Sequence, residues 1–305
     1  MPIRLDSLDE LAAQEVQLHL ALGVFDGVHV GHQVVISRAV EAARAEGGKS
    51  FVVTFSPHPI RVIAPGKAPG ALLATLDEKA ELVKSYGVDG LLVIRFDEDF
   101  AKMEAEDFVM KITEGDVKTI AVGEDWRFGA KRKGDVSMLR RIGEERGFRL
   151  EAVAPVMWDG ERISSTRIRQ AIRDGAFGAV EKMLGRKYEV AGKVIEGRKL
   201  GRQLGFPTAN IDPGDLQMPK DGVWAVDVEG IGRGVANLGV RPTVGGERKL
   251  LEVHILDFDG DLYCKVLKIS FLRFIREERK FESVDQLKVQ IGHDAEDART
   301  VEISH

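Results

Sequence analysis

The chain has 305 residues, of which 44% are hydrophobic and 30% are charged, and this composition excludes an intrinsically disordered protein. Its length allows two domains with separate cores, because single domains commonly have about 100 to 200 residues. The net charge of −5 argues against nucleic acid as the main partner, because a surface that binds nucleic acid needs an excess of basic residues.

Cysteine content and apolar run lengths indicate the cellular compartment. Cys264 is the only cysteine, which excludes an intrachain disulfide and favours a reducing environment. The first ten residues lack a long apolar run, and no stretch approaches the roughly 18 apolar residues of a membrane-spanning helix. We therefore expect a cytoplasmic protein without a membrane partner. The sequence does not indicate its oligomeric state.

The first distinctive feature is a glycine-rich turn at residues 23–32, between a predicted buried strand at 16–22 and a predicted helix at 33–45. Such a turn aims backbone N–H groups and the positive end of the helix dipole at one point, which suits phosphate. His29 and His32 can both face an anion bound there. Two neighbouring histidines are also common as ordinary surface or core residues, so the residues alone leave both interpretations open.

Alternating strand and helix patterns follow this turn. Thr75 and Glu78 form a capping box, which predicts the start of a helix. Pro57 and Pro59 are expected to end regular structure after the second strand. The alternation predicts a parallel sheet with crossover helices. The predicted strands are residues 49–55, 91–96 and 119–123, and the predicted helices are residues 75–86 and 104–113.

Three loops are expected to converge at one edge of this sheet. Ligands of parallel sheets bind beyond the carboxyl ends of the strands, which is where the turn at 23–32 and the loops at 54–59 and 123–129 lie. The third loop continues into a basic cluster at residues 131–133. A basic loop is more often a solvated surface, but its place at the strand ends favours contact with phosphate.

A run of hydroxyl side chains at Ser164, Ser165 and Thr166 precedes apolar periodicity and predicts a helix N-terminus. The same hydroxyls, with Arg167, would also neutralise a triphosphate. An amphipathic stretch at 177–184 follows. We place the domain boundary after it, which gives domains at residues 1–184 and 185–305.

From about residue 185 the pattern changes to short β-rich runs separated by glycine, which predict an antiparallel barrel or sandwich. The predicted fold class is therefore α/β: a Rossmann-like parallel-sheet domain followed by a small antiparallel β-barrel domain with C-terminal helices. The predicted strands are residues 188–195, 222–228, 232–238, 250–256 and 265–272, and the helices are residues 284–291 and 295–301.

The loop at residues 197–210 has glycines at three positions, followed by two side-chain oxygens at Thr208 and Asn210. Mg²⁺ prefers hard oxygen ligands, so a hydroxyl, an amide oxygen and ATP phosphates can complete its shell. Taken alone, the same residues are typical of a simple turn. On the strand at 250–256, Glu252 and His254 share one face, opposite the apolar residues.

These motifs resemble those of a known family. Residues 23–32, Gly-Val-Phe-Asp-Gly-Val-His-Val-Gly-His, resemble the His-x-Gly-His signature of adenine-nucleotide transferases in its FMN adenylyltransferase form. Residues 123–129 and 163–169 are similar to the second and third signatures of that group, with Trp126 where Phe is more frequent. The string Gly-Phe-Pro-Thr-Ala-Asn at 205–210 resembles the riboflavin kinase signature, and residues 235–243, 251–258 and 275–281 resemble later segments of those kinases.

From about residue 18 to residue 299, the chain thus resembles the prokaryotic bifunctional riboflavin kinases/FMN adenylyltransferases, or FAD synthetases. The resemblance implies that ATP with Mg²⁺ phosphorylates riboflavin to FMN in the barrel, and that a second ATP adenylylates FMN to FAD in the N-terminal domain. The implied partners are small molecules: riboflavin, FMN and ATP. The alternatives are a nucleotidyltransferase acting on a different phosphorylated cofactor precursor and a non-enzymatic flavin-binding regulator.

The resemblance, together with the patterns above, also assigns roles to residues. Glu252 inherits the role of the base for the riboflavin hydroxyl, whereas Arg276 contacts nucleotide or flavin unless it forms a surface ion pair. The candidates are Glu252, His29, His32 and Arg167 for catalysis; Gly23, Phe25, Asp26, Gly27, Gly31, Ser164, Ser165, Thr166, Gly201 and Gly205 for ATP or phosphate; His58, Pro59, Asp125, Arg127, Phe128 and Arg276 for flavin; and Thr208 and Asn210 for metal.

Cys264 is one departure from the family, which usually has glycine at this position. If the backbone angles there are ordinary, a side chain is tolerated. We expect Cys264 to be a small buried hydrophobic residue with little effect on function.

Overall fold

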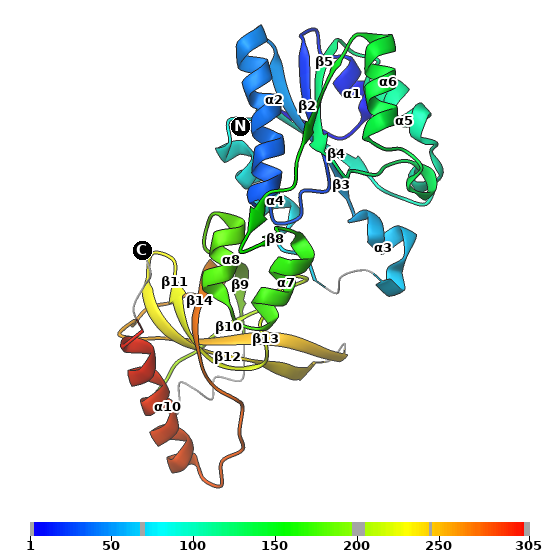
Figure 1. Cartoon of the computed structure of the whole chain (residues 1–305). Helices are drawn as coiled ribbons and strands as arrows, with labels where there is room; N and C mark the ends of the chain where they lie inside the picture. Colours follow the sequence, from blue (N-terminus) through cyan, green and yellow to red (C-terminus); the bar gives the residue numbers. More distant parts are fainter. Residues whose placement is uncertain (1–2, 68–70, 197–204, 244–245, 302–305) are drawn as a thin grey trace. The chain divides into compact units, whose positions relative to one another are not determined.

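The computed structural model describes residues 3–67, 71–196, 205–243 and 246–301 (Figure 1). Contacts divide the chain into two compact units, the first ending at Ser165 and the second beginning at Thr166. The predicted boundary at 184/185 concerns functional domains and stays a prediction. Within the described ranges, no helix is both long enough and apolar enough to cross a membrane.

The first unit is built on a six-stranded sheet with the order β1-β4-β3-β2-β5-β6, in which every pair of neighbours is parallel. The predicted parallel sheet is therefore confirmed. Its strands are β1 (Ile3–Leu5), β2 (Leu18–Leu22), β3 (Lys49–Ser56), β4 (Gly90–Arg95), β5 (Val117–Gly123) and β6 (Arg149–Val153), and a separate hairpin pairs β7 (Met157–Trp158) with β8 (Glu161–Arg162).

Helices cover both faces of this sheet (Figure 1). Side chains of β2 alternate between the two faces: Leu20 packs with α1, α5 and α6, and Ala21 packs with α2 and α4. Burial on both faces explains why β2 is apolar at every position except His19. The helices are α1 (Leu8–Ala12), α2 (Val30–Glu46), α3 (Pro59–Ile63), α4 (Leu76–Ser85), α5 (Ala105–Ile112) and α6 (Val136–Arg146), with short 3₁₀ helices η1 (Pro65–Lys67), η2 (Phe100–Lys102) and η3 (Ala130–Arg132).

Local signals account for most helix ends. The predicted capping box of Thr75 and Glu78 is present at the start of α4. α2 ends where Gly47 adopts the left-handed conformation, with φ of 78°. The expectation that Pro59 ends regular structure is wrong, because α3 begins at this residue with His58 as its N-cap. Proline suits the first helical turn, whose N–H groups have no partner within the helix.

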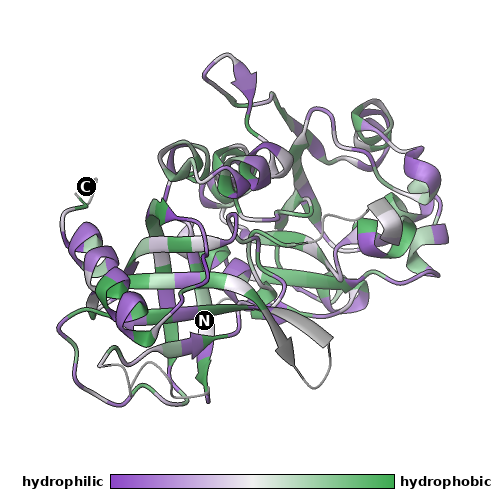
Figure 2. Ribbon diagram, turned by 90° about the horizontal axis from the view of Figure 1, so that it is seen from below, coloured by the Kyte–Doolittle hydropathy of each residue, from purple (hydrophilic) through white to green (hydrophobic). Residues whose placement is uncertain are grey.

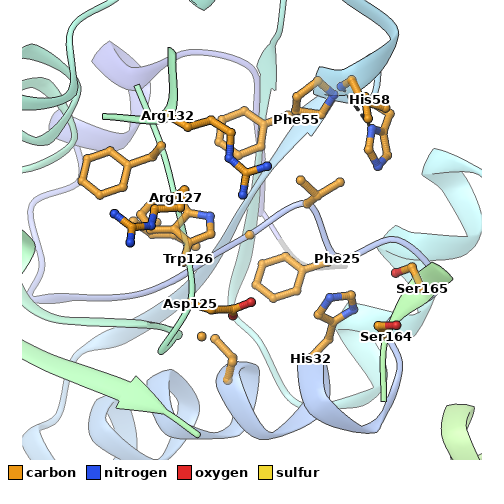
Figure 3. Close-up of a pocket in the computed structure, with 18 of the residues that line it drawn as sticks. Phe25, His32, Phe55, His58, Asp125, Trp126, Arg127, Arg132, Ser164 and Ser165 are labelled. Carbon is orange, nitrogen blue, oxygen red and sulfur yellow. Dashed lines mark hydrogen bonds between the residues drawn. The ribbon is translucent and has the colours of Figure 1, made fainter. Parts of the chain in front are cut away.

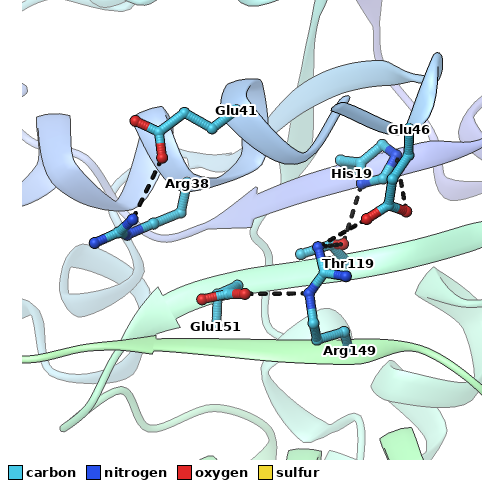
Figure 4. Close-up of polar contacts among 7 residues, drawn as sticks. All are labelled: His19, Arg38, Glu41, Glu46, Thr119, Arg149 and Glu151. Atoms are coloured by element: carbon cyan, nitrogen blue, oxygen red, sulfur yellow. Dashed lines mark hydrogen bonds and ion pairs between the residues drawn. The ribbon is translucent and has the colours of Figure 1, made fainter. Parts of the chain in front are cut away.

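A polar cluster around the buried His19 lies near the amino ends of the central strands (Figure 4). His19 of β2 is 0% exposed, and its Nδ1 lies 3.1 Å from Thr119 Oγ1. Its Nε2 lies 4.0 Å from Glu46 Oε2, and Glu46 pairs with Arg149 at 2.9 Å. Burial lowers the pKa of His19 below its ordinary value, although the Glu46 carboxylate opposes this effect. His19 is therefore a neutral imidazole at neutral pH.

The second unit contains a closed antiparallel barrel with the strand order β10-β13-β12-β11-β14-β9. The predicted small barrel is confirmed. Trp224 is fully buried inside the unit, and its indole N–H donates to the Lys220 carbonyl at 3.1 Å. The elements are α7 (Ser165–Arg173), α8 (Phe177–Leu184), β9 (Glu189–Ile195), β10 (Ala209–Ile211), β11 (Gly222–Val228), β12 (Gly232–Thr243), β13 (Gly246–Ile255), β14 (Val266–Arg276) and α10 (Val284–Arg299).

Two expectations for the second unit are wrong. The chain after residue 284 forms one continuous helix, α10, rather than two, because Gly292 lowers helix propensity without ending the helix. This helix carries both hydrophilic and hydrophobic residues (Figure 2), and its Ala295 and Ala298 pack against the barrel. Cys264 is exposed rather than buried, and its φ of 63° lies in the left-handed region that favours glycine.

Candidate active sites

A pocket of about 610 Å³ lies within the first unit, at the carboxyl ends of its strands (Figure 3). All three loops that were predicted to converge line it. Gly23 and Phe25 come from the turn after β2, His58 from the loop after β3, and Asp125 from the loop after β5. A single cleft therefore collects side chains from segments that are far apart in the sequence, as expected for a parallel sheet.

The two histidines of the turn form a stacked pair in this pocket. Their ring centroids are 3.5 Å apart and their planes differ by 17°. His29 is the N-cap of α2, and its Nδ1 accepts the backbone N–H of His32 at 3.3 Å. A ring nitrogen that accepts a hydrogen bond carries no proton, so the ring N–H of His29 is on Nε2. The edge of Phe25 packs on His32, with centroids 5.3 Å apart.

His32 is held in its neutral form. Burial lowers the pKa of His32 well below its ordinary value, and the nearby His29, Lys79 and Arg162 lower it further. Its Nδ1 is buried and has no hydrogen-bond partner among the described residues. His32 lines the pocket at the N-terminus of α2, so a ring N–H of this side chain is well placed to contact a bound anion.

The turn itself is tightly constrained. Phe25 and Val28 have φ of 50° and 42°, which is costly for residues with a side chain. The Asp26 carboxylate accepts the Leu73 N–H at 3.0 Å, and a Cβ at Gly27 would lie 2.7 Å from Leu73. Asp26 and Gly27 therefore hold the turn through their contacts with Leu73. Neither residue is among those that line the pocket. Their predicted contact with ATP stays a prediction.

Gly31 and Gly23 line the pocket where the backbone is closely packed. A Cβ at Gly31 would lie 3.2 Å from Cε1 of His29, and one at Gly23 would lie 3.0 Å from Cζ of Phe25. A larger residue at either position would displace an aromatic ring of the turn. Both glycines thus keep the histidine pair and Phe25 in place.

One part of the pocket is aromatic. Trp126 stacks on Phe128, with ring centroids 4.6 Å apart and planes 19° apart. Phe55 of β3 lines the same region (Figure 3). A wall of aromatic rings suits a flat, conjugated ligand. His58 and Pro59 also line the pocket.

Charged groups lie around this aromatic part. Asp125 pairs with Arg162, which lowers the pKa of the Asp125 carboxyl. Arg127 pairs with Asp135 at 2.8 Å. Arg132 also lines the pocket, with its backbone in the left-handed region at φ of 58°. The pocket therefore combines an apolar surface with several guanidinium groups, a pattern suited to a ligand with a flat ring and a phosphate.

The hydroxyl run is divided by the unit boundary. Ser164 and Ser165 line the pocket, and the Ser165 hydroxyl donates to the Asp26 carbonyl at 3.0 Å. Thr166 and Arg167 are in the first turn of α7 and belong to the second unit by contact. Their predicted contacts with triphosphate stay predictions.

A second polar group lies on the barrel. Asn210 of β10 is directly opposite Glu252 of β13, and Glu252 is directly opposite Asn237 of β12. Opposed residues on neighbouring strands have Cβ atoms about 4.5 to 5.5 Å apart, so these three side chains form one row. Leu251 and Val253 are 0% exposed, which confirms the predicted division of β13 into a buried and a polar face.

Asn237 was not among the predicted residues of this row. Its Nδ2 donates to Glu278 Oε1 at 3.0 Å, and its Oδ1 is buried without a hydrogen-bond partner among the described residues. The predicted metal ligand Thr208 lies just before β10, and Gly205 has φ of 88°. Gly201 lies outside the described residues. A hydroxyl and two amide oxygens near a carboxylate fit a Mg²⁺–ATP site chemically.

Two family models match the chain, FAD synthetase over residues 12–167 and riboflavin kinase over residues 184–302. A bifunctional riboflavin kinase/FMN adenylyltransferase of Escherichia coli is 42% identical over 286 residues, which cover 92% of this chain and 91% of that protein. This chain belongs to the bifunctional riboflavin kinase/FMN adenylyltransferase family. The predicted family and both predicted enzyme classes, a kinase and a nucleotidyltransferase, are confirmed.

Other comparisons extend over similar lengths. The Haemophilus influenzae member of the family is 40% identical, with 92% of each chain covered. A crystal structure from Streptococcus pneumoniae, described as that of a macrolide-efflux protein, is 34% identical with a TM-score of 0.86 and 99% of each chain covered. Together, the two family models and the 42% identity to a bifunctional member show the predicted function, riboflavin kinase and FMN adenylyltransferase, in place of the two alternatives considered from the sequence.

In this family member, Arg276 forms an ion pair within the second unit. Its Nε and Nη2 lie 2.9 and 2.7 Å from the two carboxylate oxygens of Asp294 on α10. The Asp294 side chain is 2% exposed, so the pair is buried rather than superficial. Arg276 thus forms an ion pair, which was the alternative to a role in binding nucleotide or flavin. Its predicted contact with flavin stays a prediction.

Several residues of the two sites were missed in the sequence. Asn237 and Arg132 lie inside segments that had been recognised, 235–243 and 131–133, but those segments gave no sign of which side chains face the site. Phe55 lies on a strand with six consecutive buried residues, 50–55, where pocket-lining residues and core residues have the same burial pattern. Pocket-lining residues are distinguished from core residues only by strand register and by where each strand ends, and both are known only from the structure.

Proposed function

We propose that the first unit transfers the adenylyl group of ATP to FMN, giving FAD and pyrophosphate, and that the second unit phosphorylates riboflavin with ATP and Mg²⁺ to supply the FMN. The observation that carries this proposal is that each unit holds one of the two predicted groups of polar residues. The histidine pair lines the pocket of the first unit, and Asn210 lies opposite Glu252 in the second.

Adenylyl transfer is an in-line displacement at the α-phosphorus of ATP. A phosphate oxygen of FMN forms the new bond to phosphorus, and the bond to the departing pyrophosphate breaks. The FMN phosphate is already anionic at neutral pH, so this step needs no general base. It needs positioning and stabilisation of the charge that develops on pyrophosphate.

The histidine pair and the start of α2 suit that need. The His29 ring accepts at Nδ1 and therefore offers its N–H at Nε2, and the neutral His32 ring lines the same pocket. The positive end of the α2 dipole adds to their effect. The stacked Trp126 and Phe128 would hold the flavin ring, and Ser164 would contact the triphosphate.

In the kinase step the nucleophile is a neutral hydroxyl of riboflavin, so a base within hydrogen-bond reach accelerates attack on the γ-phosphorus. We assign this role to Glu252. Thr208 and Asn210 would hold Mg²⁺ together with phosphate oxygens, and the bound ion would neutralise charge on the transferred group. Asn237, on the other side of Glu252, completes the row with an amide oxygen that has no hydrogen-bond partner among the described residues.

The proposal includes a cytoplasmic location, which the single cysteine supports because it implies no structural disulfide. The test is an incubation of the protein with riboflavin, ATP and Mg²⁺, followed by chromatographic separation of the flavins. We expect FMN to appear first and FAD to follow. Failure to form FMN would refute the kinase assignment, and FMN that is never converted to FAD would refute the adenylyl transfer assignment.

A further inference from the structure

Lys79 of α4 is buried below the turn at residues 23–32, with 7% of its surface exposed. Lysine is almost never buried unless its ammonium is paired. Its Nζ donates to the Val24 carbonyl at 2.8 Å and to Thr54 Oγ1 at 3.3 Å. The Thr54 hydroxyl donates to the same Val24 carbonyl at 2.9 Å. One carbonyl of the turn therefore receives two hydrogen bonds from two other elements.

These contacts join the elements that form the pocket floor. Val24 lines the pocket and precedes Phe25, whose φ of 50° is strained. Thr54 precedes Phe55, which lines the same pocket from β3. A strained backbone persists only where the surroundings fix it strongly. Lys79 is one of the groups that fix this turn, although it is not among the pocket-lining residues.

The charge of Lys79 also acts on the site. Three groups interact with it from other elements: the Asp26 carboxylate of the turn, the His32 ring of α2 and the Thr54 hydroxyl of β3. The ammonium is one of the groups that keep the pKa of His32 low, so it helps to hold that ring neutral. It also places a positive charge behind the turn that suits an anion.

We propose that Lys79 is a positioning residue for the adenylyl transfer that we assign to this pocket: its ammonium, bonded to the Val24 carbonyl and the Thr54 hydroxyl, holds the turn at residues 23–32 in the shape that binds ATP. This inference depends on the proposed function of the first unit. The ligand class is a nucleoside triphosphate, and Lys79 acts on it through the turn rather than by direct contact.

Stability and activity respond in opposite directions to the charge of Lys79. Burial lowers the pKa of Lys79 from 10.5 to about 8, although Asp26 opposes the effect. Between these two values the unfolded chain binds a proton that the folded chain does not, so the free energy of unfolding rises with pH. A positioning role predicts that adenylyl transfer falls over the same range, because the ammonium loses its charge.

The experiment compares the wild-type full chain with Lys79→Met and Lys79→Arg. The matched control is Lys84→Met on the same helix, where Lys84 is half-exposed and pairs only at the surface with Glu81 at 3.6 Å. For each protein, kcat and KM of FMN adenylyl transfer are measured from about pH 6.5 to about pH 9.5, where Lys79 titrates. Riboflavin phosphorylation and thermal unfolding are measured on the same samples.

We expect the wild type to lose adenylyl transfer activity with a midpoint near pH 8 while riboflavin phosphorylation continues. Lys79→Met should lower kcat on the order of 10- to 100-fold and abolish that pH dependence, because a displaced site slows reaction by this order. Lys79→Arg should restore part of the activity and keep it at alkaline pH, since guanidinium stays charged.

Three results would overturn the inference: a wild-type profile without an alkaline loss, a Lys79→Met enzyme with wild-type kcat and pH dependence, or equal loss of both activities in that variant. If Lys79→Met fails to fold, the wild-type profile and Lys79→Arg decide the question. A wild-type protein that makes no FAD from FMN at any pH would instead refute the proposed function itself, which keeps the two failures distinct.

Discussion

The substitution Glu252→Gln tests the assignment of the kinase base most sharply, because it keeps the size of the side chain and removes its basicity. Glu252 lies between Asn210 and Asn237 on the polar face of β13, while Leu251 and Val253 anchor the strand in the core. The core is untouched, so we expect a change in the free energy of unfolding within about 0.5 kcal/mol.

The expected loss of rate is large. A positioned general base contributes about 10²- to 10⁴-fold, which corresponds to about 3 to 5 kcal/mol of transition-state stabilisation. The assay measures FMN formation from riboflavin, ATP and Mg²⁺, and in parallel FAD formation from added FMN. We expect kcat for phosphorylation to fall by at least about 100-fold, with KM for riboflavin little changed and FAD formation at the parent rate.

A matched control is available on the same barrel. Glu229 is exposed and pairs with Lys268 at 3.0 Å, so Glu229→Gln should leave both activities unchanged. If Glu252→Gln phosphorylates riboflavin within a few-fold of the parent rate, the assignment of Glu252 as the base is wrong. If it loses FAD formation from FMN as well, the assignment of one site to each unit is wrong.

Three further predictions concern the two units separately. His32→Ala should lower adenylyl transfer by about 100-fold or more while riboflavin phosphorylation persists, because an oriented polar group at the developing charge is lost; an unchanged rate of FAD formation would contradict its role. His19→Gln should reduce the acid sensitivity of the first unit. Below about pH 6.5 the unfolded chain binds a proton at His19 that the folded chain does not, so the free energy of unfolding of the wild type falls by up to about 1.4 kcal/mol per pH unit on acidification. Urea unfolding at several pH values measures this free energy, and the same dependence on pH in both proteins would refute the prediction. Asp294→Ala should destabilise the second unit by about 3 kcal/mol or more, because it leaves the guanidinium of Arg276 without its buried partner; thermal unfolding of this unit at the wild-type temperature would show that the pair is unimportant.

Much of the fold could be predicted because its signals are local. The apolar run of β2 and the capping box at Thr75 each involve a few neighbouring residues. The convergence of three loops could also be predicted, because a general rule places ligand sites at the carboxyl ends of parallel strands.

Features that depend on contacts between distant residues could not be predicted in the same way. The three-residue strand β10 is too short for any periodicity, yet it sets Asn210 opposite Glu252. Lys79 looks like an ordinary charged residue of an amphipathic helix, and only the tertiary structure buries its ammonium. The positive φ of Cys264 is likewise absent from the sequence pattern, which is why its environment was predicted wrongly.

The central claim is that two independent sites act in succession on the same flavin, one in each unit. The most direct test is to mix two variants, each lacking one activity, and to supply riboflavin, ATP and Mg²⁺. Glu252→Gln alone should form FMN, and hence FAD, from riboflavin at least about 100-fold more slowly than the parent, and His32→Ala alone should accumulate FMN. We expect the equimolar mixture to produce FAD, because FMN made by one variant can be adenylylated by the other. A mixture that forms no FAD, although each variant retains its remaining activity, would contradict the claim that the two sites act independently.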